Sequence, residues 1–462
     1  MDGGTKVTSM KITAVLLAAG QGTRMKSDLP KVLHPLCGKP MVWHVLEALK
    51  SATTEKPVVI VGHGAERVTK YVGDAADCVL QEPQLGTGHA AMQAESLLKG
   101  KTDTVIVTYA DMPLLRGETF QRLVETQRLN PGPFSLLTVI ADDPRGFGRI
   151  VRNADGTVEA IVEDYVATPE QREIKELNVG AYCFKADWLW EALHRIEKNP
   201  RKGEYYLTDI VAIAVRDNLP VQAVLHDDFI ETIGINSRLH LSEAETAMRM
   251  RINREHMLNG VSMMDPASTY IDVAVTVGRD TTIMPNTYIH GNTIIGEGNV
   301  IGPNTIIRDS RIGNRCKVLA SVLEGALLED QVDMGPFAHL RKGAHLKSHV
   351  HMGNFGEVKD STLHEGVKMG HFSYIGNANI GMNTNIGAGT ITCNYDGEKK
   401  NPTEIGEDVF IGSDTMLVAP LKLGDGARTG AGAVVTKDVP EDTLVVGVPA
   451  RAIRNVERKK KK

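Results

Sequence analysis

A glycine-rich loop near the start of the chain carries residues that could bind a chain of phosphates. The apolar run 12–18 is typical of a buried parallel strand, and it leads into Gly20-Gln21-Gly22-Thr23. Backbone N–H groups of such a loop can point at phosphates, and the nearby basic side chains of Arg24 and Lys31 can neutralise their charge. The glycines alone are a weak signal, because most short glycine loops are only turns. No Gly-Lys-Ser/Thr sequence closes the loop, so it does not resemble a P-loop.

Asp111 follows a second apolar strand, 104–108, at a place where a carboxylate could hold Mg²⁺. Mg²⁺ usually takes one or two protein oxygens together with substrate phosphates. A lone Asp at a strand end is more often a turn former, so this expectation depends on the neighbouring glycine loop. Leu85-Gly86-Thr87-Gly88 opens a helix and could contact a nucleobase or a phosphate. Asn236 precedes a predicted helix, 237–259, where it could be the N-cap.

A second group of candidate residues lies far along the chain, at His371 to Tyr374 and at 385–397. A histidine can take the proton from an amine as that amine attacks a thioester. Asparagine and backbone N–H groups can stabilise the oxyanion that forms. The basic Arg341 and Lys359 could bind a sugar phosphate. Taken singly, each of these residues could also be a surface residue of a polar coil.

Four clustered histidines leave a metal site open as an alternative. Zinc would require at least three of them to converge, within one chain or between subunits. Solvent-exposed coil histidines are the favoured interpretation of this cluster, which comprises His339, His345, His349 and His351.

The second group lies in a region with a six-residue apolar period. No α-helix keeps that period, because one helical face recurs every 3.6 residues. A six-residue repeat is typical of a hexapeptide β-helix, in which each repeat gives one short strand and one turn. The aliphatic residue should point into the prism, and glycine or asparagine should serve the corners. The period is carried by Ile271, Val277, Ile283, Ile289, Ile295, Ile301 and Ile307, and later by Ile405, Ile411, Leu417, Leu423, Thr429 and Val435.

The repeat changes register in two places. The step shortens by one between Ile307 and Ile312, and the polar segment 392–402 interrupts the count. We expect this segment to leave the prism as a loop, and loops on rigid scaffolds commonly carry function.

The first part of the chain alternates apolar strands with helical patterns, which indicates a doubly wound α/β sheet. The pattern loosens after about residue 140 and predicts a lid or sugar-side subdomain rather than a new fold. We therefore expect an α/β domain at 1–235, which the resemblance described below implies is a nucleotidyltransferase, a helical linker at 236–260 and a β-helix domain at 261–462. The predicted strands are 12–18, 58–61, 79–81, 104–108 and 134–139, and the predicted helices are 41–49, 65–72, 88–98, 118–127 and 237–259.

Composition excludes several classes of protein. A chain of 462 residues with a formal net charge of -5 gives no global indication of nucleic-acid binding. Its five cysteines are scattered, which predicts reduced thiols in a cytoplasmic protein. We expect no signal peptide at 1–10 and no membrane span. The basic run 458–462 is most simply a solvated tail.

The loop string Leu17 to Arg24, with Pro30-Lys31 after it, resembles the signature L-x-x-G-x-G-T-R…P-K of the sugar-1-phosphate nucleotidylyltransferases. Nearly the whole chain, from the loop at Leu17 to the last coils, resembles the bacterial bifunctional N-acetylglucosamine-1-phosphate uridylyltransferases/glucosamine-1-phosphate acetyltransferases. The segments 84–90, 204–206 and 385–397 also stand as in that family.

The resemblance implies roles for individual residues. Those implied for UTP and UDP-N-acetylglucosamine are Leu17, Ala18, Ala19, Gly20, Arg24, Lys31, Gln81, Gly86, Thr87, Tyr109, Asp111, Gly148, Glu163, Asn178 and Asn236, with Asp111 and Asn236 holding Mg²⁺. His371 would be the general base, and glucosamine 1-phosphate would be bound by Arg341, Lys359, Tyr374 and Asn385. Acetyl-CoA would contact Ala388, Asn394, Tyr395, Ser413 and Ala431. Some members carry a basic residue near position 447 that meets the CoA phosphates; here Arg451 or Arg454 could substitute.

The resemblance also implies a left-handed prism, trimers with acyl-CoA clefts between neighbours, and a product that supplies cell-wall synthesis. Two other interpretations stay open. The β-helix could be only an oligomerisation scaffold for a nucleotidylyltransferase, although His371, Tyr374 and the Asn394-Tyr395 loop speak against that. The chain could instead be a non-catalytic assembly subunit, as in some translation-factor complexes; Lys31 and Asp111 speak against this.

Overall fold

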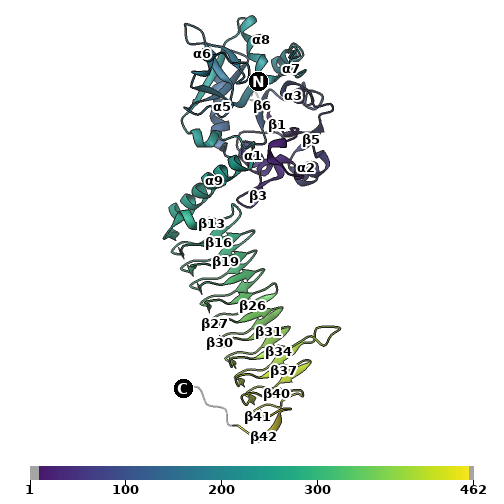
Figure 1. Cartoon of the computed structure of the whole chain (residues 1–462), viewed down its shortest axis with the longest axis vertical. Helices are drawn as coiled ribbons and strands as arrows, with labels where there is room; N and C mark the ends of the chain where they lie inside the picture. The colour runs from purple at the N-terminus through teal and green to yellow at the C-terminus, as the bar shows by residue number, and fades with distance from the viewer. Residues whose placement is uncertain (1–9, 457–462) are drawn as a thin grey trace, which may run out of the picture. The chain divides into compact units, whose positions relative to one another are not determined.

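The computed structural model describes residues 10–456, which divide into two compact units between Met248 and Arg249. The predicted basic tail at 458–462 lies outside the described residues. Figure 1 shows a first unit of helices around a sheet and a second unit of stacked short strands. Among residues 10–456, no helix combines the length and the apolar character needed to cross a bilayer. The five cysteines, all of which lie within the described residues, form no disulfide.

The first unit is built on one mixed sheet whose central strand is β1 (Ile12–Leu17). Alternate β1 residues pack into separate cores on the two faces, with Val15 and Leu17 on one and Ala14 and Leu16 on the other. The strand order is β11-β7-β10-β6-β1-β4-β5, and β8 and β9 extend the sheet from β10. The other strands are β4 (Val58–Val61), β5 (Asp77–Leu80), β6 (Thr104–Tyr109), β7 (Phe134–Ile140), β8 (Arg149–Arg152), β9 (Val158–Val162), β10 (Glu176–Lys185) and β11 (Val221–His226), with a separate hairpin of β2 (Pro35–Leu36) and β3 (Lys39–Pro40).

Parallel strands β1, β4, β5 and β6 confirm the predicted doubly wound arrangement, while β10 runs antiparallel between β6 and β7. The α-helices are α1 (Met41–Leu49), α2 (Ala65–Val72), α3 (Thr87–Met92), α4 (Glu95–Leu98), α5 (Gly117–Leu129), α6 (Pro169–Arg172), α7 (Ala186–Leu193), α8 (Ile210–Arg216) and α9 (Arg238–Leu258). Short 3-10 helices are η1 (Thr23–Met25), η2 (Lys31–Leu33), η3 (Gly73–Ala75), η4 (Leu207–Asp209), η5 (Phe229–Thr232) and η6 (Pro266–Ser268).

The single helix predicted at 88–98 is wrong, because the chain forms α3 and α4 with a break between them. The side chain of Gln93 donates to the carbonyl of His89 at 2.9 Å, and its backbone N–H donates instead to Ala90 at 3.2 Å. A side chain that takes over a helix carbonyl competes with the regular i to i−4 bond. That competition ends the first helix at Met92.

The second unit is a left-handed parallel β-helix with three faces. The first face contains β12 (Ser262–Met263), β15 (Thr282–Ile283), β18 (Val300–Ile301), β21 (Lys317–Val318), β24 (Asp333–Met334), β27 (His351–Asn354), β30 (Lys368–His371), β33 (Asn385–Ile386), β36 (Phe410–Ile411), β39 (Arg428–Thr429), β41 (Thr443–Val446) and β42 (Arg451–Asn455). The second contains β13 (Thr269–Ile271), β16 (Thr287–His290), β19 (Ile306–Arg308), β22 (Val322–Glu324), β25 (His339–Leu340), β28 (Glu357–Lys359), β31 (Tyr374–Gly376), β34 (Ile391–Cys393), β37 (Met416–Val418) and β40 (Val434–Val435). The third contains β14 (Thr276–Val277), β17 (Ile294–Ile295), β20 (Arg311–Ile312), β23 (Leu327–Leu328), β26 (Ala344–Leu346), β29 (Ser361–Leu363), β32 (Ala378–Ile380), β35 (Thr403–Ile405) and β38 (Leu421–Leu423).

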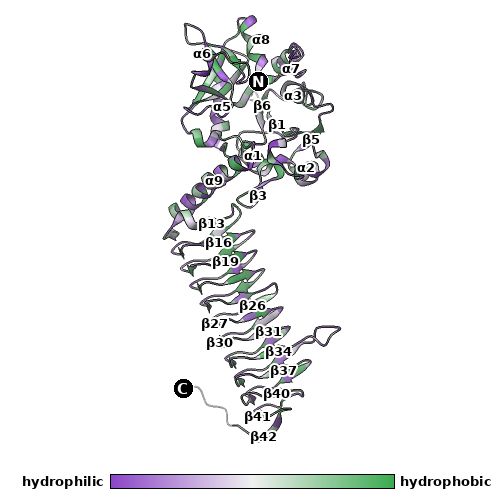
Figure 2. Ribbon diagram, in the orientation of Figure 1, coloured by the Kyte–Doolittle hydropathy of each residue, from purple (hydrophilic) through white to green (hydrophobic). Residues whose placement is uncertain are grey.

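Aliphatic residues of successive coils stack inside the prism, as the six-residue period predicts. Ile283 pairs with Ile301, and both side chains are fully buried. Figure 2 shows hydrophobic residues recurring at equivalent places in neighbouring coils. The predicted shortened step is present, since Ile295 aligns with Ile312, one residue short of three full repeats.

Further register changes occur that the sequence analysis did not predict. Leu363 aligns with Ile380, again one residue short of three repeats, and corners absorb the difference without disturbing the buried ladder. The interrupting loop begins later than predicted, because Thr392 and Cys393 still belong to β34 and pair with β37. Figure 1 shows the loop after β34 projecting from the stack.

Candidate functional sites

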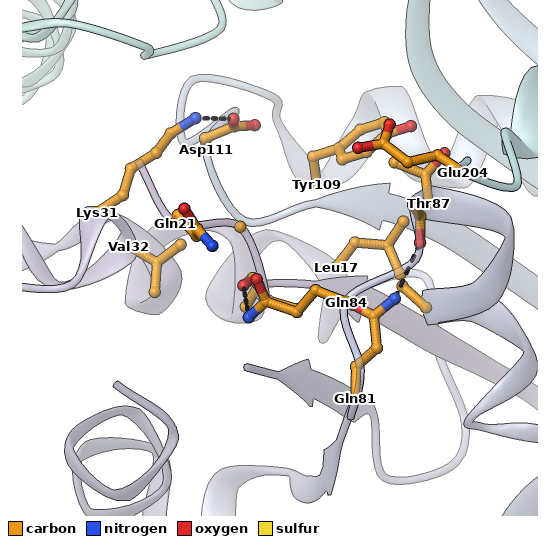
Figure 3. Close-up of a pocket in the computed structure, with 15 residues that line it drawn as sticks. Leu17, Gln21, Lys31, Val32, Gln81, Gln84, Thr87, Tyr109, Asp111 and Glu204 are labelled. Carbon is orange, nitrogen blue, oxygen red and sulfur yellow. Dashed lines mark hydrogen bonds and ion pairs between the residues drawn. The ribbon is translucent and has the colours of Figure 1, made fainter. Parts of the chain in front are cut away.

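The glycine-rich loop borders a cavity of about 410 Å³ at the carboxyl end of β1. Parallel α/β sheets bind ligands at this edge, where neighbouring connections leave in opposite directions. Figure 3 shows Lys31 and Asp111 on one side of the cavity, with Thr87 and Glu204 on the other. Ten predicted nucleotide-binding residues line it: Leu17, Ala18, Ala19, Gly20, Lys31, Gln81, Gly86, Thr87, Tyr109 and Asp111.

Gly86 allows two distant segments to meet beside this cavity. Its φ is 97°, and a Cβ there would stand 2.6 Å from the carbonyl oxygen of Tyr205, so no larger residue fits. The N–H of Gly88 donates to that carbonyl at 2.8 Å, and the N–H of Tyr205 donates to Leu85 at 2.7 Å. These bonds bring Glu204 into the cavity wall, a position not included among the predicted site residues.

Two glutamine amides fix the floor of the cavity. Gln81, 4% exposed, donates to the carbonyl of Gly86 at 2.9 Å. Gln84 donates to the carbonyl of Ala19 at 2.8 Å, which ties the loop after β5 to the loop after β1. Figure 3 shows both contacts. Gln84 lies in the quoted family segment but was not predicted as a site residue.

A lysine, an aspartate and an asparagine from three separate segments meet at the end of the cavity. The ammonium of Lys31 forms an ion pair with Asp111 and donates to Oδ1 of Asn236 at 2.7 Å. Asp111 follows β6, and Asn236 lies just before α9. The alternative role of Asn236 as the helix N-cap is wrong, because Ser237 Oγ accepts from the N–H of His240 in the first turn.

A second, smaller cavity of about 180 Å³ adjoins the first and shares Tyr109 and Asp111 with it. Its wall contains the predicted sugar-binding residues Gly148, Glu163 and Asn178, together with Asn236. Glu163 accepts from the hydroxyl of Thr208 at 2.9 Å, and Asn178 donates to the hydroxyl of Tyr182 at 2.8 Å. Burial raises the pKa of Tyr109, which keeps its hydroxyl neutral between the two cavities.

Arg24 stands apart from the residues that line the cavities. It lies on η1 with an exposed side chain and is absent from both walls. The spacing of a loop motif predicts the position of the backbone better than the position of a long, flexible side chain.

The oxygens of Asp111 and Asn236 are suited to a hard divalent cation. Both accept from a single ammonium, so they converge on one point, and carboxylate and amide oxygens are the ligands that Mg²⁺ and similar ions take. Among residues 10–456, no group of three or more His, Cys, Asp or Glu side chains is arranged to hold a metal ion. A cation here would therefore complete its coordination with substrate oxygens or water.

In the second unit, His371 lies at the end of β30, at the corner between the first and second faces. Its Nδ1 is 2.8 Å from Oδ1 of Asn354, the equivalent corner residue one coil earlier. An amide oxygen can only accept, so Nδ1 carries the proton and Nε2 is left as the basic nitrogen. Asn354 was not predicted, although its position on the same face one coil before the histidine follows from the repeat.

Three basic side chains gather on the second face beside this corner. Arg341 pairs with Glu357 at 2.9 Å, and Lys359 lies 3.5 Å from Asp360. Lys400, from the loop after β34, contacts Lys359, whose ammonium lowers the pKa of Lys400. Lys400 is a further residue that the sequence analysis missed, because only the folded loop brings it back over the prism.

Tyr374 and Asn394 meet over Gly376. A Cβ on Gly376 would lie 2.5 Å from the Tyr374 hydroxyl and 2.7 Å from Nδ2 of Asn394, so both side chains cover the glycine. Asn394 also donates to Oδ1 of Asn377 at 2.7 Å. Asn385 lies on β33 of the first face, one coil beyond Lys368, with which it pairs.

The residues predicted to contact acetyl-CoA lie mainly along one corner. Ala388, Ser413 and Ala431 occupy equivalent places in three successive coils, since Asp414 N–H donates to Ala388 and Gly432 N–H donates to Ser413. Tyr395 stands in the projecting loop, where it is 62% exposed. Arg451 and Arg454 both lie on the exposed strand β42.

Three exposed phenylalanines form a ladder along the same corner in earlier coils. Phe337, Phe355 and Phe372 are 60%, 55% and 69% exposed and have φ values of 60°, 56° and 38°. The rings of Phe337 and Phe355 stack at 5.5 Å. Bulky residues rarely adopt positive φ, and large exposed apolar groups usually mark contact surfaces. The sequence feature that could have predicted this ladder is the phenylalanine that directly follows each of Pro336, Asn354 and His371.

The four clustered histidines do not converge within the chain. His339, His345 and His351 lie on three different faces and interact with Glu324, Glu329 and Asp333 respectively.

The two units match different families. Residues 14–154 match the MobA-like NTP transferase domain, and residues 274–309 and 402–437 match the bacterial transferase hexapeptide repeats. The whole chain is similar to the bifunctional protein GlmU of several bacteria. It is 47% identical to that of Geobacillus sp. (strain WCH70) over 95% of both chains. It is 48% identical to that of Geobacillus thermodenitrificans, also over 95% of both, and 44% identical to that of Streptococcus equi subsp. zooepidemicus over 96% of this chain and 97% of the relative. With both candidate sites inside this full-length match, the chain belongs to the family of the bifunctional protein GlmU.

Proposed function

We propose that this chain makes UDP-N-acetylglucosamine through two activities on separate units. Acetyl-CoA first acetylates the amine of glucosamine 1-phosphate, and CoA leaves. A phosphate oxygen of N-acetylglucosamine 1-phosphate then attacks the α-phosphorus of UTP, and pyrophosphate leaves. The observation that carries the proposal is the membership of the GlmU family over 95% of both chains, with a distinct candidate site in each unit. Within these two units, we assign residues 1–235 to uridylyl transfer, 236–260 to a helical linker whose first residue, Asn236, belongs to the first site, and 261–462 to acetyl transfer.

In the first unit, the uridine nucleotide occupies the larger cavity and the amino sugar the smaller one. The loop Leu17 to Gly20 lines the phosphate side, while Gln81, Gly86 and Thr87 line the base side. Tyr109 and Asp111 line both cavities, which supports a position of the α-phosphorus beside the sugar phosphate. Catalysis here consists mainly of positioning and charge neutralisation, as in phosphoryl transfer generally.

Family membership is consistent with a divalent metal requirement, and we propose Mg²⁺ held by Asp111 and Asn236. When bound, the ion supplies positive charge to the phosphates. Lys31 supplies a further positive charge from the chain itself. Arg24 is an auxiliary contact whose exposed side chain could reach over the loop.

In the second unit, His371 removes the proton from the sugar amine as it attacks the thioester carbonyl. Asn354 holds the imidazole in the tautomer that leaves Nε2 free. Arg341, Lys359 and Lys400 bind the sugar phosphate, because three cations beside fewer carboxylates favour an anion. Tyr374 and Asn385 position the sugar, and acetyl-CoA lies along Ala388, Ser413, Ala431 and the Asn394-Tyr395 loop, with Arg451 or Arg454 near its phosphates.

We propose that the chain works as a homotrimer in the cytoplasm. Hexapeptide β-helices commonly assemble, and the Phe337, Phe355 and Phe372 ladder offers an apolar edge beside His371. Sedimentation of the purified protein at micromolar concentration should give the mass of three chains.

The decisive assay supplies glucosamine 1-phosphate, acetyl-CoA, UTP and Mg²⁺, and omits each in turn. UDP-N-acetylglucosamine should form only in the complete mixture, together with free CoA. If product forms only when N-acetylglucosamine 1-phosphate is added ready-made, the β-helix is a scaffold and the acetyl-transfer proposal is wrong.

A further inference from the structure

The Lys31 ammonium already occupies the place suited to a metal ion. It contacts both candidate ligand oxygens, forming an ion pair with Asp111 and a 2.7 Å hydrogen bond to Asn236. The side chain of Lys31 is only 12% exposed and that of Asp111 22%, so little water competes for these contacts. Figure 3 shows the lysine stem running along the cavity toward the carboxylate.

The glycine-rich loop holds the lysine in this orientation. Gly22 has a φ of 62°, and a Cβ there would stand 2.7 Å from Cβ and 3.3 Å from Cδ of Lys31. The backbone of Gly22 therefore packs against the aliphatic part of the Lys31 side chain and directs its ammonium to Asp111. The same lysine lines the larger cavity, whereas Asn236 lines only the smaller one and Asp111 lines both. Lys31 thus stands where phosphates and a metal ion would meet.

An ammonium and a divalent cation cannot share these oxygens without strong repulsion. A metal that arrives alone must displace the ammonium and leave it in a partly buried place without an anion. A metal that arrives with phosphates gives the ammonium a new partner on the cavity side. Binding of the metal and of the nucleotide are therefore linked through one side chain, and such linkage is reciprocal.

We propose that Lys31 is the resident cation of this site and exchanges between Asp111 and the nucleotide phosphates, so that bare metal binds weakly and metal with nucleotide binds tightly. This inference rests on the proposed uridylyl-transfer function. It adds to that function by assigning Lys31 two successive partners, first Asp111 and then the nucleotide phosphates.

The test measures Mn²⁺ binding by electron paramagnetic resonance of the free ion, without nucleotide and without turnover. Lys31→Met removes the charge and keeps the stem, and it should bind Mn²⁺ roughly tenfold more tightly than the wild type, within the usual range of such couplings. Lys31→Arg keeps the charge and should stay close to the wild type. Lys26→Met, an exposed lysine on the same loop, controls for net charge and should also match the wild type. Equal or weaker Mn²⁺ binding by Lys31→Met overturns the exchange.

A second measurement uses the wild-type protein, so the test does not depend on whether the Lys31→Met variant folds. With ¹³C-labelled lysine, the ε-carbon signal that is missing from Lys31→Arg identifies Lys31. Titration with Mg²⁺ alone should shift that signal as the ammonium leaves Asp111. A signal that does not move at saturating Mg²⁺ contradicts the proposal.

Asp111→Ala separates this inference from the assignment on which it rests. Loss of Mn²⁺ binding in Asp111→Ala with no gain in Lys31→Met rejects the exchange and keeps the metal site. Unchanged Mn²⁺ binding in Asp111→Ala rejects the metal site itself, and the exchange with it.

Discussion

The two candidate sites are built on opposite plans. In the first unit the polar groups line cavities and are paired with one another before any substrate arrives, as Lys31 is with Asp111. In the β-helix they stand on open faces, and Arg341 is 43% exposed beside a partner that is 36% exposed. A cavity can exclude water with one chain alone, whereas an open face needs a substrate or another surface to cover it. All residues that line the first candidate site lie in one unit, whereas we infer that the second site depends on assembly.

The largest effect should come from removing the carboxylate at the centre of the first site. Asp111→Ala should abolish uridylyl transfer, because Lys31 and the proposed metal both lose their anionic partner. Acetyl transfer should stay unchanged, since the variant lies in the other unit. Separate assays of the two half-reactions measure this, with the exposed Asp142→Ala as a matched control. Loss of both activities in a folded variant would remove the functional separation of the two units.

The matching change in the second site is His371→Ala. Acetyl transfer should fall about 10² to 10⁴-fold, the usual contribution of a general base, while uridylyl transfer is retained. His364→Ala, which removes a half-buried histidine bonded to Asn379, is the control. An unchanged acetylation rate would show that some other group takes the proton.

A smaller effect should follow from loosening the imidazole instead of removing it. Asn354→Ala deletes the acceptor for Nδ1–H, and a hydrogen bond of this kind contributes about 1.5 kcal/mol, or roughly tenfold in kcat for acetylation. Asn354→Asp should restore most of the rate, because a carboxylate also accepts from Nδ1–H. The KM for glucosamine 1-phosphate should hardly change. A rise in KM with kcat retained would instead place Asn354 in sugar binding.

The smallest effect concerns the exposed cations. Lys400→Met should raise the KM for glucosamine 1-phosphate roughly threefold, because exposed charge pairs contribute only about 0.5–1 kcal/mol. The neighbouring Lys399→Met is the control, and the effect should shrink at high salt. A large loss would mean that the loop closes over the phosphate and buries it.

Sequence reasoning recovered the periodic parts of the molecule well. The buried ladder from Ile283 to Ile307 follows from spacing alone, and α1 and α2 have the predicted bounds. It also identified ten of the residues that line the larger cavity and, in the smaller one, Gly148, Glu163, Asn178 and Asn236 as well, because a family pattern fixes which loops meet at the carboxyl ends of the strands. Gln84 and Glu204 were missed. The family itself was correctly inferred from the same segments.

What the sequence did not show were contacts between side chains distant in the chain. The break between α3 and α4 depends on the Gln93 side chain, and the meeting of Lys31 with Asn236 depends on how three segments fold together. Lys400 and Asn354 were missed for the same reason, since each acts through a neighbour one coil or one loop away. A local sequence pattern predicts the backbone conformation of a segment. Side-chain contacts between distant segments depend on how the whole chain folds.

Each coil of the prism pairs only with the coils directly before and after it, so its stability is close to a one-dimensional sum of neighbouring contacts. Apart from Arg451 or Arg454 on β42, the residues proposed for acetyl transfer extend from Arg341 to Ala431 and therefore need an unbroken block of stacked coils. Unfolding that begins at the terminal strands β41 and β42 can proceed inward only by the unfolding of one coil after another. The proposed catalytic corner at His371 lies several coils inside that end, so early unfolding of the terminus should leave that corner intact.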